Sequence, residues 1–334
     1  MTNASLACAV RSRINLAVAA ALTAVVVAGC GPNPDPGPGA RSGSVDAAFA
    51  GSLQLVMSKY LGPEFTRADG YPYQGRGGGS LGLAQEVISG EITPNVFISV
   101  GPGPLALLEP RYTRWALRIA SSPLVVAYYP SGPYANRLSQ IRDHKMPLRD
   151  LFTLLAQPGF RLGRTDPATD PQGQAFAMMV GLAVKLYRLP PGLAAQDLGG
   201  SDPGSQIYPE TALEAQLQAG QLDAASAFES QAVQLHLPFI TLPSSINFGD
   251  PKDQARYRAA SLRISPTEVV HGSLLDLEAT VLGRDSRAAA LAFLVFLASH
   301  QGRTTLSREG YETPPPQLLG DPSAAPAIVR QVVG

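Results

Sequence analysis

Four polar residues of this chain follow a predicted strand at the point where a helix begins: Ser52, Ser80, Asp170 and Glu229. The first turn of a helix presents unpaired backbone N–H groups and the positive end of the peptide dipole, which together bind anions. The two serines add hydroxyl donors, and the two acidic residues add carboxylates. The pattern predicts a site for a small ligand, because the carboxyl ends of strands meet at one edge of an open α/β sheet.

The best defined of these positions is Asp170. It follows the polar loop that begins at Gly163, and Pro171 and an apolar run to Tyr187 follow it. Aspartate is favoured at the N-cap of a helix, and proline is favoured at the first helical position. The spacing alone therefore leaves two interpretations open, a helix cap and a ligand-binding carboxylate. Glu229, directly after the apolar segment 223–228, is open to the alternative of an ordinary surface glutamate.

Glycines precede both serines. Gly51 lies between the predicted strand 45–50 and Ser52, and the run from Gly75 to Gly79 reads as a flexible turn before Ser80. Glycine lets the backbone approach a ligand closely, although serine is also common as a helix cap. Two such turns, each after a strand, favour an anion site more than either one alone.

Catalysis has little support in the sequence. His144, His236, His271 and His300 lie in no nucleophile or zinc signature, and the turn before Ser80 lacks the lysine of a phosphate-binding loop. The chain of 334 residues has a formal net charge of zero, so it has no basic surplus for nucleic acid. We expect a protein that is not an enzyme, needs no cofactor and binds no nucleic acid.

The N-terminus has the features of an export signal. Arg11 and Arg13 precede an apolar run from Leu16 to Ala28, and small residues then lead to Cys30, as in bacterial lipoprotein signals. We expect residues 1–29 to be removed, Cys30 to carry the lipid, and residues 30–44, rich in proline and glycine, to form a tether. The alternative is a plain secretory signal with an incidental cysteine.

Strand and helix patterns alternate through the rest of the chain, which predicts an α/β fold with mostly parallel sheets. The run 122–129 is β-branched and aromatic, and it is the best candidate for a passage between two lobes. The apolar run 287–299 predicts a core helix.

Several motifs together resemble those of the tungstate/molybdate-binding proteins of ABC importers, in their archaeal-type branch. They are the segments Ala50–Leu53 and Gly79–Ser80, the Gly-Arg-Thr-Asp-Pro block at 163–167 with Asp-Pro-Gln-Gly at 170–173, Phe228–Gln234, Leu242–Lys252 and Gly310–Pro314. The resemblance covers residues 45 to 318. The chain departs from the usual pattern after Asp170, where Gln172 to Ala175 replace Cys-Gly-Tyr-Arg, and at Ser230, where a bulky residue is common.

The resemblance implies a type II periplasmic-binding-protein fold of two α/β lobes joined by a hinge with two crossings. Residues 45–124 plus 269–320 would form lobe 1, residues 125–268 lobe 2 and residues 321–334 a C-terminal tail, with crossings near 124–128 and 264–270. We expect the lobes to close on the ligand by hinge rotation.

The resemblance also implies a function. Ser52, Ser80, Asp170 and Glu229 would hold molybdate or tungstate between the lobes, with both carboxylates bonded directly to the metal. The protein would be an exported, lipid-anchored monomer that delivers its ligand to a permease.

Two carboxylates beside a dianion repel it in a desolvated cleft unless something offsets the charge. Molybdenum and tungsten expand from four to six oxygen neighbours, whereas the sulfur of sulfate does not. The sequence does not separate molybdate from tungstate. It also leaves open another solute, such as sulfate, phosphate or a small organic acid, and an enzyme or a sensor built on the same scaffold.

Overall fold

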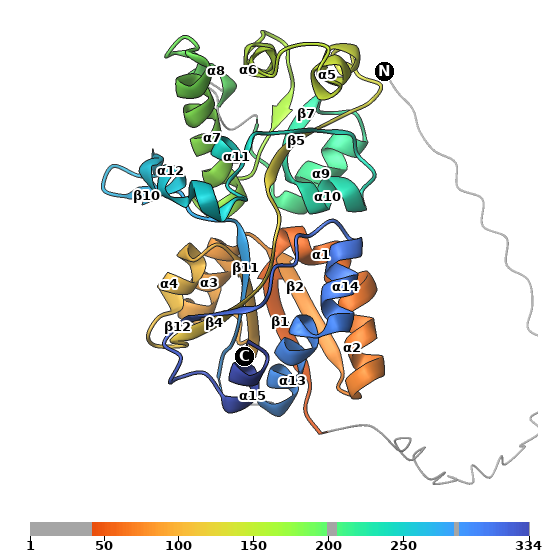
Figure 1. Ribbon diagram of the computed structural model, residues 1–334, viewed down its shortest axis with the longest axis vertical. Coiled ribbons are helices and arrows are strands. Elements are labelled where there is room, and N and C mark those ends of the chain that lie inside the picture. The colour runs from red at the N-terminus through yellow and green to blue at the C-terminus, as the bar shows by residue number, and fades with distance from the viewer. Residues whose placement is uncertain (1–41, 199–205, 284–286, 334) are drawn as a thin grey trace, which may run out of the picture. The chain divides into compact units, whose positions relative to one another are not determined.

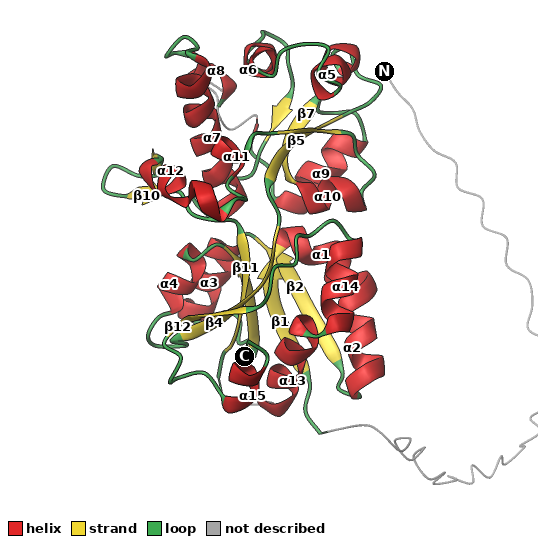
Figure 2. Ribbon diagram, viewed as in Figure 1, coloured by secondary structure: helices red, strands yellow, loops and turns green. Residues whose placement is uncertain are grey.

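The computed structural model describes residues 42–198, 206–283 and 287–333. They form helices around two main β-sheets, which define two lobes (Figures 1 and 2). The sequence prediction of a two-lobe α/β fold is therefore confirmed. The predicted signal peptide, Cys30 and nearly all of the predicted tether lie outside the described residues.

Lobe 1 is built on a six-stranded sheet in the order β12-β4-β11-β3-β1-β2. Its strands are β1 (Val45–Ala50), β2 (Tyr73–Gly78), β3 (Val96–Val100), β4 (Trp115–Ser121), β11 (Asp276–Val281) and β12 (Gln317–Gly320). Its helical segments are η1 (Gly51–Leu53), α1 (Gln54–Val56), η2 (Met57–Leu61), α2 (Gly62–Asp69), α3 (Ser80–Ser89), α4 (Gly103–Leu108), α13 (Arg287–Ala298), α14 (His300–Arg308) and α15 (Ala327–Gln331).

Lobe 2 is built on a four-stranded sheet in the order β6-β7-β5-β8. Its strands are β5 (Leu124–Tyr128), β6 (Leu162–Gly163), β7 (Ala224–Phe228) and β8 (Phe239–Thr241). Its helices are α5 (Ala135–Arg142), α6 (Arg149–Leu155), α7 (Pro171–Tyr187), α8 (Leu193–Asp197), α9 (Glu210–Gln218), α10 (Glu229–Gln234) and α11 (Ser244–Asn247). A short extension follows, with η4 (Pro251–Asp253), α12 (Gln254–Ala259) and the two-stranded sheet of β9 (Ser261–Arg263) and β10 (Val269–His271).

The sheets are mixed, which corrects the expectation of mostly parallel strands. In lobe 1, β1 pairs in parallel with β2 and β3, whereas the pairs of β11 with β3 and β4, and of β12 with β4, are antiparallel. In lobe 2, β6 and β7 pair in parallel, whereas β5 is antiparallel to both β7 and β8. The sequence misled here because strand patterns reveal burial but not the direction of a partner that returns from the other lobe.

The chain passes between the sheets at slightly different places from those predicted. The first passage is at Ser122 and Pro123, between β4 and β5, and the segment 124–128 is itself a strand of lobe 2. The second passage is at 272–275, between β10 and β11, rather than at 264–270. The segment 321–334, predicted as a tail, contains α15, whose Val329 is fully buried in the core.

The glycine run before Ser80 is a strand and not a flexible turn. Residues 73–78 form β2, which pairs with β1 along its whole length. A Cβ on Gly75 would lie 2.6 Å from the Phe49 ring, and one on Gly77 would lie 2.6 Å from Gln54 Oε1. These glycines therefore allow neighbouring side chains to lie directly on the backbone of β2.

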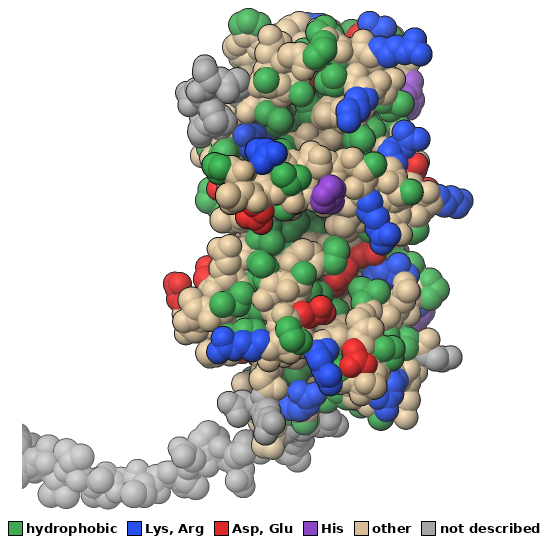
Figure 3. Space-filling view, turned by 90° about the vertical axis from the view of Figure 1, so that its left-hand side faces the viewer, with side chains coloured by type: hydrophobic (Ala, Val, Ile, Leu, Met, Phe, Trp, Pro, Cys, Tyr) green, Lys and Arg blue, Asp and Glu red, His purple; other side chains and the backbone are tan. Residues whose placement is uncertain are grey.

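The surface in Figure 3 carries acidic side chains at the level where the two lobes meet. A cavity of about 570 Å³ opens between the lobe 1 sheet and the extension at α12, and we call it the sheet cavity. Arg118, Asp276 and Glu278 of the sheet line it, together with Glu109 and with Arg258 of α12.

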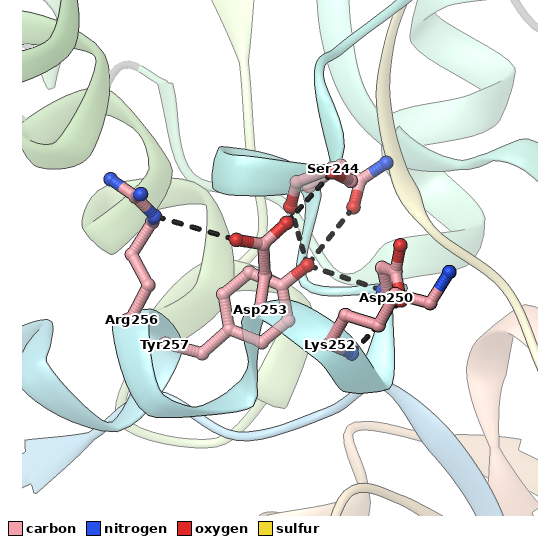
Figure 4. A network of polar contacts seen from close by, with 7 residues as sticks. Ser244, Asp250, Lys252, Asp253, Arg256 and Tyr257 are labelled. Atoms are coloured by element: carbon pink, nitrogen blue, oxygen red, sulfur yellow. Dashed lines mark hydrogen bonds and ion pairs between the residues drawn. The ribbon is translucent and has the colours of Figure 1, made fainter.

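One of the motifs behind the family resemblance, Leu242–Lys252, joins α11 to α12 through a polar network (Figure 4). Ser244 Oγ donates to Asp253 Oδ2 at 2.7 Å, and Arg256 pairs with the same carboxylate at 3.5 Å. The Tyr257 hydroxyl donates to the Ser244 carbonyl and accepts from the backbone N–H of Asp250 at 3.2 Å. These contacts fix the extension from which the chain returns to lobe 1.

Candidate functional site

A cavity of about 310 Å³ lies between the two lobes, and we call it the cleft cavity. Lobe 1 contributes backbone from Gly51 and from residues 77–79 at the end of β2. Lobe 2 contributes Thr165, Asp166, Thr169, Asp170 and residues 207–211 around the start of α9. None of the described residues that line this cavity is a lysine or an arginine, so any anion there depends on neutral donors.

Asp170 is the predicted site residue that lines the cleft cavity. It is also the N-cap of α7, because its Oδ1 accepts the backbone N–H of Gln172 at 2.8 Å and Pro171 is the first helical residue. Burial raises the pKa of Asp170 to about 7, the Gln172 N–H lowers it in part, and the charge of Asp166 raises it further. The capping prediction is confirmed, and the same residue lines the cavity.

The two serines directly follow, in the chain, glycines that line the cavity. Ser52 is buried in η1, and its Oγ has no hydrogen-bond partner within the described residues. The Ser52 carbonyl accepts the Tyr311 hydroxyl at 2.9 Å. Ser80 begins α3, and its Oγ accepts the backbone N–H of Val100 at 3.5 Å. Neither serine is among the residues that line the cavity.

Glu229 does not line the cleft cavity either. It begins α10, its side chain is half-buried, and its backbone N–H donates to the Pro123 carbonyl at the first passage at 3.0 Å. Burial raises the pKa of Glu229, and the charge of Glu312 raises it further. Of the two carboxylates predicted from the sequence, Asp170 therefore lines the cleft cavity and Glu229 does not.

A carboxyl that the sequence did not single out, that of Glu210, faces the cleft cavity beside Asp170. It stands at the first position of α9 and is buried. Burial, and then the charges of Asp170 and Glu214, raise its pKa well above the usual range. Its only local signal is Pro209 before an acidic residue, which is an ordinary helix start, so sequence reasoning had no ground to select it.

Two glutamine amides hold Glu210 in place. Gln231 Nε2 and Gln172 Nε2 donate to Glu210 Oε1 at 2.8 Å and 3.2 Å. Gln172 Nε2 also donates to Gln231 Oε1 at 2.9 Å, and Ser226 Oγ donates to Gln172 Oε1 at 2.8 Å. Gln172 is one of the departures from the usual family motif, and here its amide takes part in the network beneath the cavity.

Among the described residues, no cluster of three or more histidine, cysteine, aspartate or glutamate side chains has the arrangement of a metal site. The helices of the same residues include none with the length and apolar character needed to span a bilayer.

Comparison with known proteins decides the family. Residues 45–312 match the model of the bacterial extracellular solute-binding proteins. The chain belongs to this family.

A candidate ABC transporter molybdenum-binding protein of Haloferax volcanii is 33% identical to this family member over 78% of each chain. The molybdate/tungstate-binding protein WtpA of Pyrococcus abyssi is 27% identical, over 67% of this chain and 70% of that one. These matches confirm the resemblance that the sequence motifs indicated.

The periplasmic molybdate-binding protein of Azotobacter vinelandii has the same fold, with a TM-score of 0.56 and 15% identity over 81% of this chain and all of the other. The family consists of solute-binding proteins, so the expectation that this solute-binding protein is not an enzyme is confirmed.

Proposed function

We propose that this solute-binding protein captures molybdate or tungstate between its two lobes and delivers it to the permease of an ABC importer. The observation that carries the proposal is the buried Asp170 carboxyl, which faces the cleft cavity from the N-terminus of α7. A helix N-terminus favours an anion, and the carboxylate has an oxygen that can bond a metal centre. The two archaeal relatives, a molybdenum-binding and a molybdate/tungstate-binding protein by name, support the same ligands.

The chemistry of the cleft cavity favours these oxyanions over sulfate. No lysine or arginine lines the described part of the cavity, and carboxyls do. A carboxylate repels sulfate, whereas it can become a fifth or sixth oxygen ligand of molybdenum or tungsten. Repulsion of the wrong anion and bonding to the right one act together in selectivity.

Ser52, Ser80 and Glu229 belong to this proposal as further ligand contacts. Ser52 has a buried hydroxyl with no partner in the described structure, which leaves it a donor to offer to an oxyanion. Ser80 stands at the start of α3, and Glu229 at the start of α10 beside the first passage. Glu229 would act as the second metal-bonding carboxylate together with Asp170.

The remaining parts of the proposal concern attachment and assembly. Cys30 would carry the lipid anchor after removal of residues 1–29, and the protein would act as a monomer at the outer face of the cell membrane without a cofactor. Cys30→Ser should release the protein from the membrane fraction. Retention of a processed, membrane-bound Cys30→Ser variant would contradict the lipid anchor.

Isothermal titration calorimetry with tungstate, molybdate, sulfate and phosphate tests the ligand. We expect the unmodified protein to bind the first two and to reject the others. Asp170→Ala and Glu229→Ala should each weaken tungstate binding by about 2 kcal/mol or more, the scale for loss of a charged partner in a buried site. Ser52→Ala and Ser80→Ala should weaken every bound oxyanion alike. Tight sulfate binding by the unmodified protein would contradict direct bonding to the metal.

A further inference from the structure

Glu210 contacts the opposite lobe at the turn that carries Ser52. A Cβ added to Gly51 would lie 2.3 Å from Glu210 Oε2, so the carboxylate lies directly against the backbone of this turn. The backbone N–H of Ser52 lowers the pKa of the Glu210 carboxyl in part. A side chain of lobe 2 therefore lies against a backbone donor at the cavity wall of lobe 1.

The Ser52 N–H is the kind of donor that an oxyanion in the cleft cavity would use. It lies at the start of the helical segment after β1, beside Gly51, which lines the cavity. A carboxylate and a tetrahedral oxyanion both present negatively charged oxygens to such an amide. The Glu210 carboxylate and the ligand of the proposed function therefore require the same donor.

The side chain of Glu210 is held in one conformation by its neighbours, unlike an exposed side chain that samples several rotamers. Gln231 and Gln172 donate to its Oε1, and Gln231 is itself fixed by the Phe228 N–H, which donates to Gln231 Oε1 at 2.8 Å. The residue retains only 6% of its exposed surface. Burial beside Asp170 and Glu214 disfavours a charge at this position, which makes the contact with Ser52 one of few that offset the cost.

We propose that the Glu210 carboxyl group competes with the oxyanion for the Ser52 turn and thereby sets the affinity of the site. The proposal rests on the proposed function for the identity of the ligand. Its structural part, the contact between Glu210 and the Ser52 turn, does not depend on that function.

Two variants remove the carboxylate, and a third is the matched control. Glu210→Gln keeps the shape of the side chain and removes its charge, and Glu210→Ala removes the contact altogether. Glu214→Gln removes the charge of a neighbouring carboxyl, which accepts from the same Gln231 but has no contact with the Ser52 turn among the described interactions. Thermal melting of the three variants establishes that each is folded.

The first measurement uses no ligand. Hydrogen–deuterium exchange of the full-length chain, followed by mass spectrometry of the peptide that covers residues 50–57, reports protection of the Ser52 amide. We expect exchange about tenfold faster in Glu210→Ala and Glu210→Gln, because the contact of the carboxyl with this turn is lost. Glu214→Gln should exchange at the parent rate.

The second measurement is calorimetry with sodium tungstate. We expect both Glu210 variants to bind tungstate about tenfold more tightly than the parent, since the competing carboxyl is gone, and Glu214→Gln to stay within about twofold. Unchanged exchange in the Glu210 variants would overturn the contact. Faster exchange with equal or weaker tungstate binding would overturn the competition and make Glu210 a structural support.

Calorimetry distinguishes failure of this inference from failure of the proposed function. If the parent chain binds no tungstate and Glu210→Ala does, competition is supported in its strongest form. If the parent binds tungstate and Glu210→Ala binds it no better, this inference fails and the proposed function stands. If neither binds it, both fail.

Discussion

The cleft cavity and the sheet cavity both contain buried carboxyls, but the charge of these groups is offset in different ways. In the cleft cavity, backbone N–H groups and glutamine amides contact Asp170 and Glu210, and no cation lines the described walls. In the sheet cavity, Arg118 Nη1 lies 3.7 Å from Asp276 Oδ2, Arg258 lines the same wall, and Glu278 lies beside them.

The difference shows that the groups around a buried carboxyl decide whether it is available to a ligand. A carboxylate paired with arginine is already compensated and gains little from a ligand. A carboxyl that is hydrogen-bonded only to neutral donors still has an oxygen that can bond a metal centre or compete with a ligand for a donor. This contrast supports the proposal that the ligand binds in the cleft cavity and that the carboxyls of the sheet cavity have a structural role.

The largest expected effect is on tungstate affinity, when one carboxyl in each cavity is replaced by the corresponding amide. Asp170→Asn should preserve much of the cap on α7, since asparagine is an N-cap of similar quality. It should nevertheless weaken tungstate binding by about 2 kcal/mol, because the carboxylate proposed to bond the metal is lost. Glu278→Gln should leave binding unchanged. Calorimetry on both variants tests the contrast, and an equal loss in both would abolish it.

The second effect concerns stability and pH in the sheet cavity. Burial, followed by the charges of Asp276 and Glu109, raises the pKa of Glu278 to about 8. Because the folded pKa exceeds the unfolded one, the stabilising contribution is complete below the unfolded pKa and is lost as the pH rises through about 8.

Glu278→Gln removes this dependence. At about pH 9 it should raise the free energy of unfolding by about 1–2 kcal/mol, and the gain should disappear at about pH 5. Urea denaturation at the two pH values measures it, and a pH-independent difference would contradict the assignment.

The third prediction tests whether ligand binding in the cleft cavity requires the two lobes to approach each other closely. A Cβ on Gly79 would lie 2.5 Å from the Thr169 carbonyl oxygen of lobe 2, a backbone atom that cannot turn away. Gly79→Ala should therefore weaken tungstate binding about tenfold. Gly82→Ala is the control, because its Cβ would lie no closer than 3.7 Å to Thr169. If calorimetry finds the two variants equal, close approach does not limit binding.

The smallest effect separates the two serines. Ser52 Oγ is buried with no partner in the described structure, so Ser52→Ala should leave stability unchanged or raise it by up to about 1 kcal/mol. Ser80→Ala loses the long bond from Val100 and should lower stability slightly. Both should reduce affinity for an oxyanion. A clear loss of stability in Ser52→Ala would show that its hydroxyl has a structural partner.

The sequence by itself determined the features that depend on neighbouring residues. Asp170 and Pro171 predicted the cap and start of α7, and apolar runs predicted β1 and α13 within a few residues. Cap chemistry and apolar periodicity act over a few residues, so they can be read without a fold. The motifs that indicated the family likewise lie in short continuous segments.

The tertiary structure alone decided which distant groups meet. The direction of β11 against β3 and β4, the glycine strand β2 and the approach of Glu210 to the Ser52 turn all depend on contacts between residues far apart in the chain. Glu229 and Glu210 both begin helices of lobe 2, and only Glu210 lines the cleft cavity. Both glutamates are ordinary helix starts in the sequence. Their different surroundings arise because long-range packing, and not local propensity, sets burial and electrostatic partners.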